Sequence, residues 1–310
     1  MNTTNKNAKA QAEHAVAKVE EVKGNTAVAA VNDIPDYMKG KQGAGTENLD
    51  SHDMEIPRIK LIQALSPELQ TFNGLKPGEF WHTLAETSIG REVRISPIYI
   101  DRRFILWRPR KAGGGILARA DDGVNWSPAN TDFQVTLPET KKTVTWRTGG
   151  DVADVNGRVL AKNVGTVDAS GLANWGSYDP SDANSQPAAT LMYTLVVALP
   201  DYPEMGFAQL TLQRGAVKVA KNLIGKIRMH RAPSYGRVFR MASVEEQGQS
   251  GSFMNYKFVA DGFVPADVFP AYEALYEQFK SKGLNIKDLD DLQDDASNPA
   301  HEGKGNDKDF

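Results

Sequence analysis

One interval of the sequence combines positive charge with aromatic rings, a pairing that can bind a nucleic-acid strand. No acidic residue lies between Glu204 and Glu245. The interval carries Arg214, Lys218, Lys221, Lys226, Arg228, Arg231, Arg237 and Arg240. Tyr235 and Phe239 lie among these cations. Because cations neutralise phosphates and flat rings stack on bases, such an interval is typical of proteins that bind single strands.

A second basic interval lies earlier in the chain and has only Glu92 and Asp101 as acids. Its basic residues are Arg91, Arg94, Arg102, Arg103, Arg108, Arg110 and Lys111. Phe104 and Trp107 lie within it, and elsewhere Trp146 is next to Arg147. Basic residues usually form a solvated surface, and a single aromatic residue is more often part of a core than a ligand contact. The scarcity of acids and the interleaved rings favour the nucleic-acid interpretation.

The two intervals together predict the residues of a DNA-binding site. The residues expected to neutralise phosphates are Arg102, Arg103, Arg108, Arg110, Lys218, Lys221, Arg228, Arg231, Arg237 and Arg240. The residues expected to stack on bases are Trp107, Phe239 and Tyr235. Alternation along a strand would place Arg237, Phe239 and Met241 on one face of that strand.

Sequence signatures of enzymes are absent. The five histidines are scattered, and none has a partner three or four residues away that would suit a metal. There is no P-loop, dinucleotide-binding, zincin or nucleophile-elbow motif. Residues 151–159 approach the spacing of a calcium loop, but Asn156 and Gly157 are better explained as a hairpin turn. We therefore expect no enzymatic activity, no bound metal and no cofactor.

Composition narrows the class of protein further. The chain has 310 residues, a net charge of −3, 40% hydrophobic residues and no cysteine. The missing cysteines exclude disulfides, thiolate zinc sites and cysteine nucleophiles, and they fit a reducing compartment. The first residues contain no apolar run typical of a secretion signal, and the longest apolar run, from Leu191 to Leu199, is too short to cross a bilayer. We expect a cytoplasmic protein that does not bind membranes.

The pattern of apolar residues predicts a mainly β (α+β) fold. Between residues 56 and 264, short strand-like segments alternate with Gly, Pro, Asn and Asp. Helical spacing predicts two helices, over residues 214–231 and 265–283. The first helix would bury Val217, Ala220, Leu223, Ile224 and Ile227, and the second would bury Phe269, Tyr272, Leu275, Tyr276 and Phe279. Many short strands with few helices favour an OB-type barrel with extra hairpins.

Both ends of the sequence differ in composition from the middle. Residues 1–50 are rich in Ala, Asn, Lys, Thr and Gly, which predicts a disordered arm. Residues 284–310 are aspartate-rich and predict a disordered acidic tail that ends on Phe310. The nucleic-acid-binding core is therefore predicted over residues 51–283. An acidic tail tethered to a basic groove would compete for that groove until a polyanion displaces it.

The tail also carries a resemblance. It ends Lys308-Asp309-Phe310 and in this respect resembles the single-stranded DNA-binding replication proteins of tailed phages. The central region looks like a set of phage-encoded proteins through IPRIKLIQALSPEL, the turn at Gly78 to Phe80 and the residues around Trp107. The chain is longer than the compact phage binders, and its N-terminal arm and barrel strands have no counterpart that can be matched to theirs.

The resemblance implies an OB-type core, cooperative coating of exposed strands, and docking of a polymerase or helicase through Asp307, Asp309 and Phe310. The functional hypothesis is thus a phage-type protein that coats and protects single-stranded DNA in replication or recombination. Two alternatives stay open: a recombination protein that anneals single strands, and a phage structural or assembly protein. The sequence also leaves open whether the protein forms a homo-oligomer.

Overall fold

The computed structural model describes residues 45, 56–229, 231–248 and 251–282 of the chain. The chain divides into two units, Met1–Asp53 and Met54–Phe310, and every helix and strand described below lies in the second unit. Apart from Gly45, the predicted N-terminal arm (1–50) lies outside the described residues, and so does the whole predicted acidic tail (284–310).

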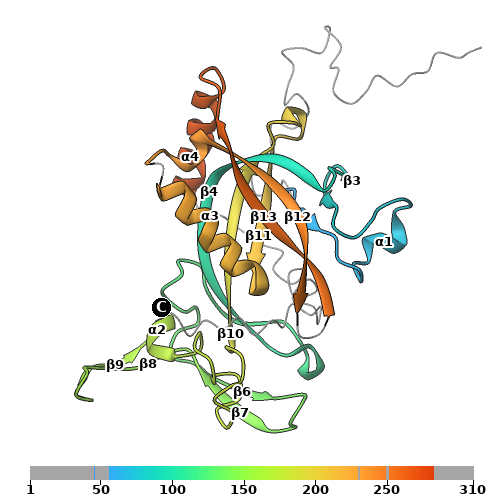
Figure 1. Ribbon diagram of the computed structural model, residues 1–310. Coiled ribbons are helices and arrows are strands. Elements are labelled where there is room, and N and C mark those ends of the chain that lie inside the picture. The colour runs from blue at the N-terminus through green and yellow to red at the C-terminus, as the bar shows by residue number, and fades with distance from the viewer. Residues whose placement is uncertain (1–44, 46–55, 230, 249–250, 283–310) are drawn as a thin grey trace, which may run out of the picture. The chain divides into compact units, whose positions relative to one another are not determined.

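A six-stranded antiparallel sheet forms the centre of the second unit (Figure 1). Its longest strand, β4, extends over 16 residues and pairs with β10, β12 and β5. The strand order is β11-β10-β4-β12-β13, with β5 paired to β4 outside this path. The strands are β4 (Glu92–Trp107), β5 (Ile116–Ala120), β10 (Ala189–Ala198), β11 (Phe207–Gln213), β12 (Arg237–Gly248) and β13 (Gly251–Phe263). The predicted mainly β fold is confirmed.

A small three-stranded sheet lies between β11 and β13, the strands at the two ends of this order. It consists of β1 (Ile59–Leu61), β2 (Phe80–His82) and β3 (Thr87–Ser88). Just before β1, Arg58 forms a parallel bridge with Gln209 of β11. Just after β1, the side-chain amide of Gln63 accepts from the backbone N–H of Met254 in β13 and donates to its carbonyl, both at 2.9 Å. Among the described residues no ladder joins β11 to β13, and the OB-type topology stays a prediction.

The remaining strands form two hairpins and have a core of their own. The hairpins are β6 (Asp132–Thr136) with β7 (Thr143–Arg147), and β8 (Gly150–Ala153) with β9 (Val159–Val164). Trp126 and Trp146 are buried in this second core, together with Leu106 from β4 and Ala189 from β10. The short helices are α1 (Glu68–Thr71) and α2 (Val167–Ser170), with 3-10 turns η2 (Arg110–Ala112), η3 (Pro203–Met205), η4 (Arg214–Ala216) and η5 (Ser234–Gly236).

The two long helices cover opposite faces of the main sheet. Helix α3 (Val217–Met229) buries its apolar residues in the same core as Leu195 and Val197 of β10. Helix α4 (Phe269–Lys282) packs its aromatic residues against Val196 and other residues of the adjacent cluster. Because successive side chains of a strand point to opposite faces, the two helices must lie on different sides of β10. Both predicted helices are therefore present, with ends close to those expected.

His82 in β2 gives the fold a testable pH dependence. Its side chain is buried, its Nδ1 accepts from the backbone N–H of Ala85 at 3.1 Å, and its Nε2 has no hydrogen-bond partner. Burial lowers the pKa of His82 below its ordinary value of 6.5. The unfolded chain therefore takes up this proton before the folded chain does, and folding stability decreases as the pH falls below about 6.5.

We expect His82→Asn to remove this contribution while keeping an acceptor for the N–H of Ala85. Urea unfolding at several pH values should show that the wild-type protein loses up to about 1.4 kcal/mol more per pH unit than the variant in this window. Carboxylates such as Asp201, whose pKa is lowered by Arg94, titrate in both proteins and cancel in the comparison. Parallel stability curves for the two proteins would contradict the assignment to His82.

Candidate nucleic-acid interface

The solvent-facing side of α3 carries a stripe of positive charge. Lys218, Lys221 and Arg228 are exposed and follow each other at helical spacing, whereas Ala220 and Leu223 on the opposite side are buried in the core. We call Lys218, Lys221 and Arg228 the α3 stripe. No carboxylate of the described residues forms an ion pair with any of the three. Since these charges are not neutralised within the described part of the chain, they are available to an external polyanion.

Two polar contacts fix α3 along β13. Asn255 Nδ2 donates to the carbonyl oxygen of Gly215, just before the helix, at 3.4 Å. Lys226 Nζ donates to the carbonyl oxygen of Phe258, further along the strand, at 2.6 Å. The helix therefore runs in the same direction as β13 (Figure 1). The basic last turn of α3 lies toward the end of β13 at Phe263.

Gly225 lies within the stripe, between Lys221 and Arg228, and is exposed. A Cβ atom at this position would meet nothing within 4 Å, so packing does not require glycine here. Glycine inside a helix costs about 1 kcal/mol relative to alanine. A missing side chain on a basic helix surface would let a phosphate backbone approach closely.

We expect Gly225→Ala to stabilise the protein by about 0.5–1 kcal/mol and to weaken binding of single-stranded DNA. Thermal unfolding and fluorescence anisotropy of a labelled oligonucleotide would measure the two effects. Asn222→Ala is the matched control, because Asn222 is exposed on the same helix but already carries a Cβ atom. If Gly225→Ala binds DNA as tightly as the control, close approach at Gly225 is excluded.

The predicted phosphate-binding residues of β4 and the following turn divide into two groups. Arg102, Arg108 and Arg110 are exposed. The guanidinium of Arg102 also donates to the carbonyl oxygen of Gly123 at 3.1 Å and lies 5.8 Å from the ring centre of Phe104. Arg103, in contrast, is only 2% exposed.

Arg103 is engaged by two carboxylates. Its guanidinium pairs with Asp101, two residues earlier on the same face of β4, and lies 3.6 Å from Asp121. Removing a charge from water is costly unless it is paired, and here the pairing is internal. The prediction that Arg103 neutralises a phosphate is therefore wrong for this structure.

The predicted stacking residues are also inside the protein. Trp107 is 7% exposed and packs with Ile105 and Met192, while Phe239 is fully buried in the core beneath α3. A ring that is covered on both faces cannot stack on a base, so these two predictions are wrong. Trp107 and Phe239 instead contribute apolar surface to the core, the ordinary role of aromatic residues in β-rich proteins.

Tyr235 belongs to the contact between η5 and α4. Its ring lies 5.0 Å from that of Tyr276 and 5.3 Å from that of Phe269, measured between centroids. Its hydroxyl donates to Glu273 at 3.0 Å, and burial together with this carboxylate raises the pKa of Tyr235. A ring held in an aromatic cluster of this kind has a structural role, so the stacking predicted for Tyr235 does not fit its position.

The two arginines of β12 differ in their surroundings. Arg240 is exposed, but it pairs with Asp261 of β13 at 3.1 Å and with Glu92 of β4 at 3.7 Å. Arg237 is 4% exposed and lies against the ring of Phe263. Six phosphate-binding residues were predicted from Lys218 onward. Those that are exposed and make no ion pair with a described carboxylate are Lys218, Lys221, Arg228 and Arg231.

Phe263 is a residue that the sequence reasoning missed. It is the last residue of β13 and is 66% exposed, unlike the aromatic residues selected from the sequence. Its position in the sequence could have indicated this exposure. Phe263 follows Gly262 at the end of a predicted strand, where fewer neighbouring residues cover a side chain.

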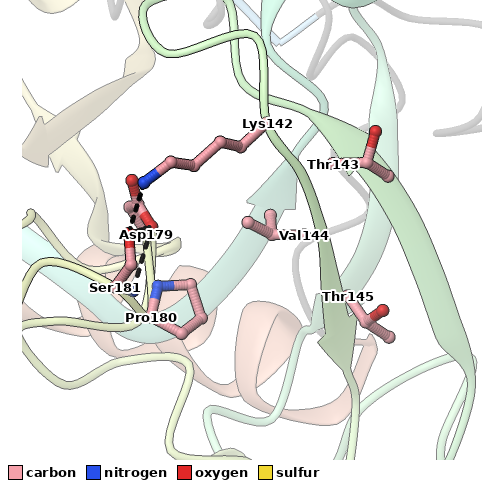
Figure 2. A pocket seen from close by; sticks show the side chains of 7 residues that line it. All are labelled: Lys142, Thr143, Val144, Thr145, Asp179, Pro180 and Ser181. Atoms are coloured by element: carbon pink, nitrogen blue, oxygen red, sulfur yellow. Dashed lines mark hydrogen bonds between the residues drawn. The ribbon is translucent and has the colours of Figure 1, made fainter.

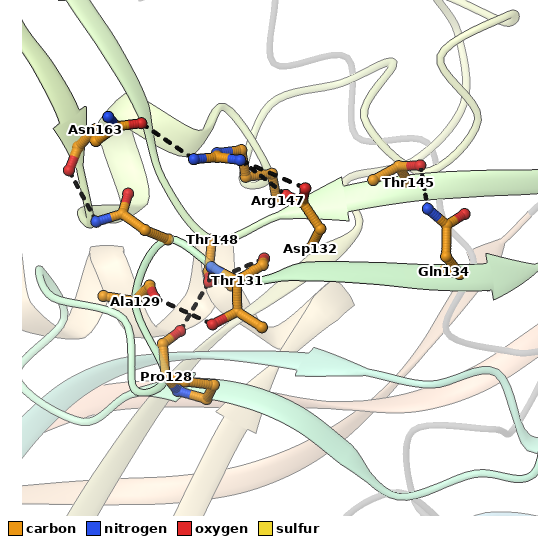
Figure 3. Close-up of polar contacts among 10 residues, drawn as sticks. Pro128, Ala129, Thr131, Asp132, Gln134, Thr145, Arg147, Thr148 and Asn163 are labelled. Atoms are coloured by element: carbon orange, nitrogen blue, oxygen red, sulfur yellow. Dashed lines mark hydrogen bonds and ion pairs between the residues drawn. The ribbon is translucent and has the colours of Figure 1, made fainter.

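Trp146 and Arg147, the third aromatic–basic pair, have structural roles in β7. Trp146 is buried, and its Nε1 donates to the carbonyl oxygen of Tyr178 at 3.2 Å. Figure 3 shows Arg147 between Asp132 and Asn163, with which it makes contacts of 3.1 Å each. This arginine therefore ties the two hairpins together and is neutralised locally.

A groove of about 480 Å³ lies beside the same hairpin, formed by β7 and the loop that contains Asp179 (Figure 2). Its one cation, Lys142, donates from Nζ to Ser181 Oγ at 2.8 Å. Hydrogen bonds from Ser181 lower the pKa of Asp179, which holds a negative charge at the groove. None of the predicted DNA-binding residues lines this groove, and its residues are separate from the α3 stripe.

The described residues include no group of three or more His, Cys, Asp or Glu side chains arranged to hold a metal ion. In the same ranges, each helix is too short or too polar to cross a bilayer.

Comparison with known proteins identifies a family. The model of a family described as Pam3 phage gp34-like protein matches residues 23–285, which is most of the chain. No curated protein and no solved structure shows significant similarity.

Proposed function

We propose that this chain, which belongs to the Pam3 phage gp34-like protein family, is a non-enzymatic protein that coats and protects single-stranded DNA in phage replication or recombination. The observation that carries the proposal is the α3 stripe, three exposed cations on an acid-free helix. Arg231 is exposed just after α3, and its backbone N–H donates to the carbonyl oxygen of Arg228 at 3.2 Å, so that a fourth cation follows the stripe closely. A surface of this kind attracts the phosphates of a flexible strand without reading its sequence.

Single strands fit this surface better than duplex DNA. The described residues provide one short helix stripe of positive charge, about 15 Å long at 1.5 Å per residue over Lys218 to Arg228. Bases of a single strand are also free to turn toward an exposed ring, which those of a duplex are not.

The experiment that tests the proposal compares three ligands with the full-length protein. A labelled 30-nucleotide single strand, the same sequence as a duplex, and the single strand with excess unlabelled complement are titrated in fluorescence anisotropy. The proposal expects tight binding of the single strand, weaker binding of the duplex, and no accelerated pairing of the complement. Rapid pairing of the complement would favour strand annealing instead. Absence of any DNA binding would favour a structural or assembly role.

The acidic tail contributes to the proposal through shielding. From Asp288 onward the sequence has eight acidic residues and, as basic residues, only Lys304 and Lys308. A flexible tether of this length gives an effective concentration of about millimolar, enough for the tail to compete with DNA for the basic surface. We expect removal of residues 288–310 to tighten DNA binding by up to about tenfold. Docking of a polymerase or helicase, assigned to Asp307, Asp309 and Phe310, should be lost in the same variant.

Phe310→Ala separates the two roles of the tail. This variant keeps every acid, so DNA affinity should match the wild type while co-purification of replication proteins is lost. Anisotropy titrations and pull-downs from infected cells would provide the two readings. An unchanged DNA affinity after removal of residues 288–310 would contradict shielding.

A further inference from the structure

Phe263 presents a flat ring to solvent at the end of β13. In the β12–β13 ladder it lies directly opposite Arg237, the first residue of β12. The guanidinium carbon of Arg237 is 4.3 Å from the centre of the Phe263 ring and 5.9 Å from that of the buried Phe239. Arg237 therefore supports Phe263 from the protein side, while 66% of Phe263 stays exposed.

Among the described residues, the charge of Arg237 has no carboxylate partner. The residue is 4% exposed, yet no carboxylate of the described residues lies within ion-pair distance of it. Its Nε is buried and has no hydrogen-bond partner. The nearest acid in the ladder, Asp261, is engaged by Arg240. A cation that is nearly removed from water without a partner is costly, and an anion bound beside it would lower that cost.

The last turn of α3 and the segment after it carry two more exposed cations, Arg228 and Arg231. The contacts of Gly215 and Lys226 with β13 direct the helix toward Phe263, so that Arg228 in the last turn lies at the same end as the ring. Arg231 follows in the segment that leads into β12, and the backbone N–H of Val264 donates to Gly236 at 3.1 Å. This bond keeps the end of β13 beside the start of β12.

We propose that Phe263 and Arg237 form a stacking site for one unpaired nucleobase, with the flanking phosphates placed at Arg228 and Arg231. The inference rests on the proposed function and names the residues that hold a base. A nucleotide supplies both things that the site lacks: a flat partner for the exposed face of Phe263 and a negative charge near Arg237. Stacking on phenylalanine accepts any base, and the attraction of the guanidinium to the other face holds the ring in position.

The test uses the full-length protein and an oligothymidine strand that carries one 2-aminopurine, whose fluorescence is quenched when it stacks. Phe263→Leu keeps an apolar side chain and removes the ring, and Phe263→Trp keeps a ring. Base–aromatic stacking corresponds to roughly a 5- to 150-fold change in affinity, so Phe263→Leu should weaken binding by at least about fivefold and reduce quenching. Phe263→Trp should retain both.

Val259→Ala serves as the matched control, because Val259 is also a partly exposed apolar residue of β13. It should bind as the wild type does, and thermal unfolding should show that all variants fold. If the wild type binds DNA but Phe263→Leu shows the same affinity and quenching, the stacking site is excluded and the proposed function stands. If the wild type itself does not bind, the proposed function and this inference both fail.

Discussion

Replacing Lys218, Lys221 and Arg228 by alanine is expected to weaken single-stranded DNA binding about 100-fold at 0.1 M salt. Each contact between a cation and a single-strand phosphate releases about 0.7 counterion, which corresponds to roughly a fivefold contribution at this salt concentration. The three exposed residues of the α3 stripe make no ion pair with the described carboxylates. Replacing them should therefore lower DNA affinity and change the free energy of unfolding little.

The control for this variant removes the same net charge elsewhere. Arg94, Arg119 and Arg147 are exposed in part, and each is paired with an aspartate: Asp201, Asp121 and Asp132. Their triple alanine variant should bind DNA within a few-fold of the wild type. Anisotropy titrations of both variants, with thermal unfolding to confirm folding, would provide the comparison. Equal losses in the two variants would mean that overall charge, and not the α3 stripe, determines binding.

Phe239→Ala is expected to lower the free energy of unfolding by about 3–5 kcal/mol. Phe239 is fully buried among the residues that α3, β4 and β10 contribute to the main core, and truncating it leaves a cavity that the surrounding strands cannot fill. Phe239→Leu keeps most of the volume and should cost less than about 1.5 kcal/mol. Urea unfolding of the purified variants would measure both values.

DNA affinity distinguishes this structural role from the stacking role that the sequence suggested. Phe239→Leu lacks the aromatic ring but keeps the core, so it should bind single-stranded DNA as tightly as the wild type. A variant that unfolds like the wild type but loses DNA affinity would show that the Phe239 ring reaches the ligand, contrary to its burial in this structure.

The helices could be predicted from the sequence because their apolar spacing is local. Ala220, Leu223 and Ile227 are buried as the 3.6-residue period requires, and Lys218, Lys221 and Arg228 on the other side of the helix consequently point outward. The mainly β class followed in the same way from short apolar segments separated by turn residues. The pairing of β4 with β10 and β12 could not be predicted, because it joins segments far apart in the chain and depends on the completed core.

Only part of the DNA-binding site could be predicted, because the direction of a side chain depends on non-local contacts. Runs of basic residues show which segments are positive, but not where each arginine points once a strand has formed. Asp101 and Arg103 are two residues apart and therefore share a face of β4, a pattern that would have predicted their ion pair. The contact of Arg237 with Phe263 depends on the register of two strands, and no local pattern contains that register.

The salt dependence of single-stranded DNA binding by the wild-type protein tests the central claim most directly. We expect the three cations of the α3 stripe, or more, to contact phosphates. A plot of the logarithm of the association constant against the logarithm of the salt concentration should then have a slope of about −2 or steeper. A flat dependence, or no measurable binding at 50 mM salt, would contradict the assignment of α3 as a nucleic-acid interface.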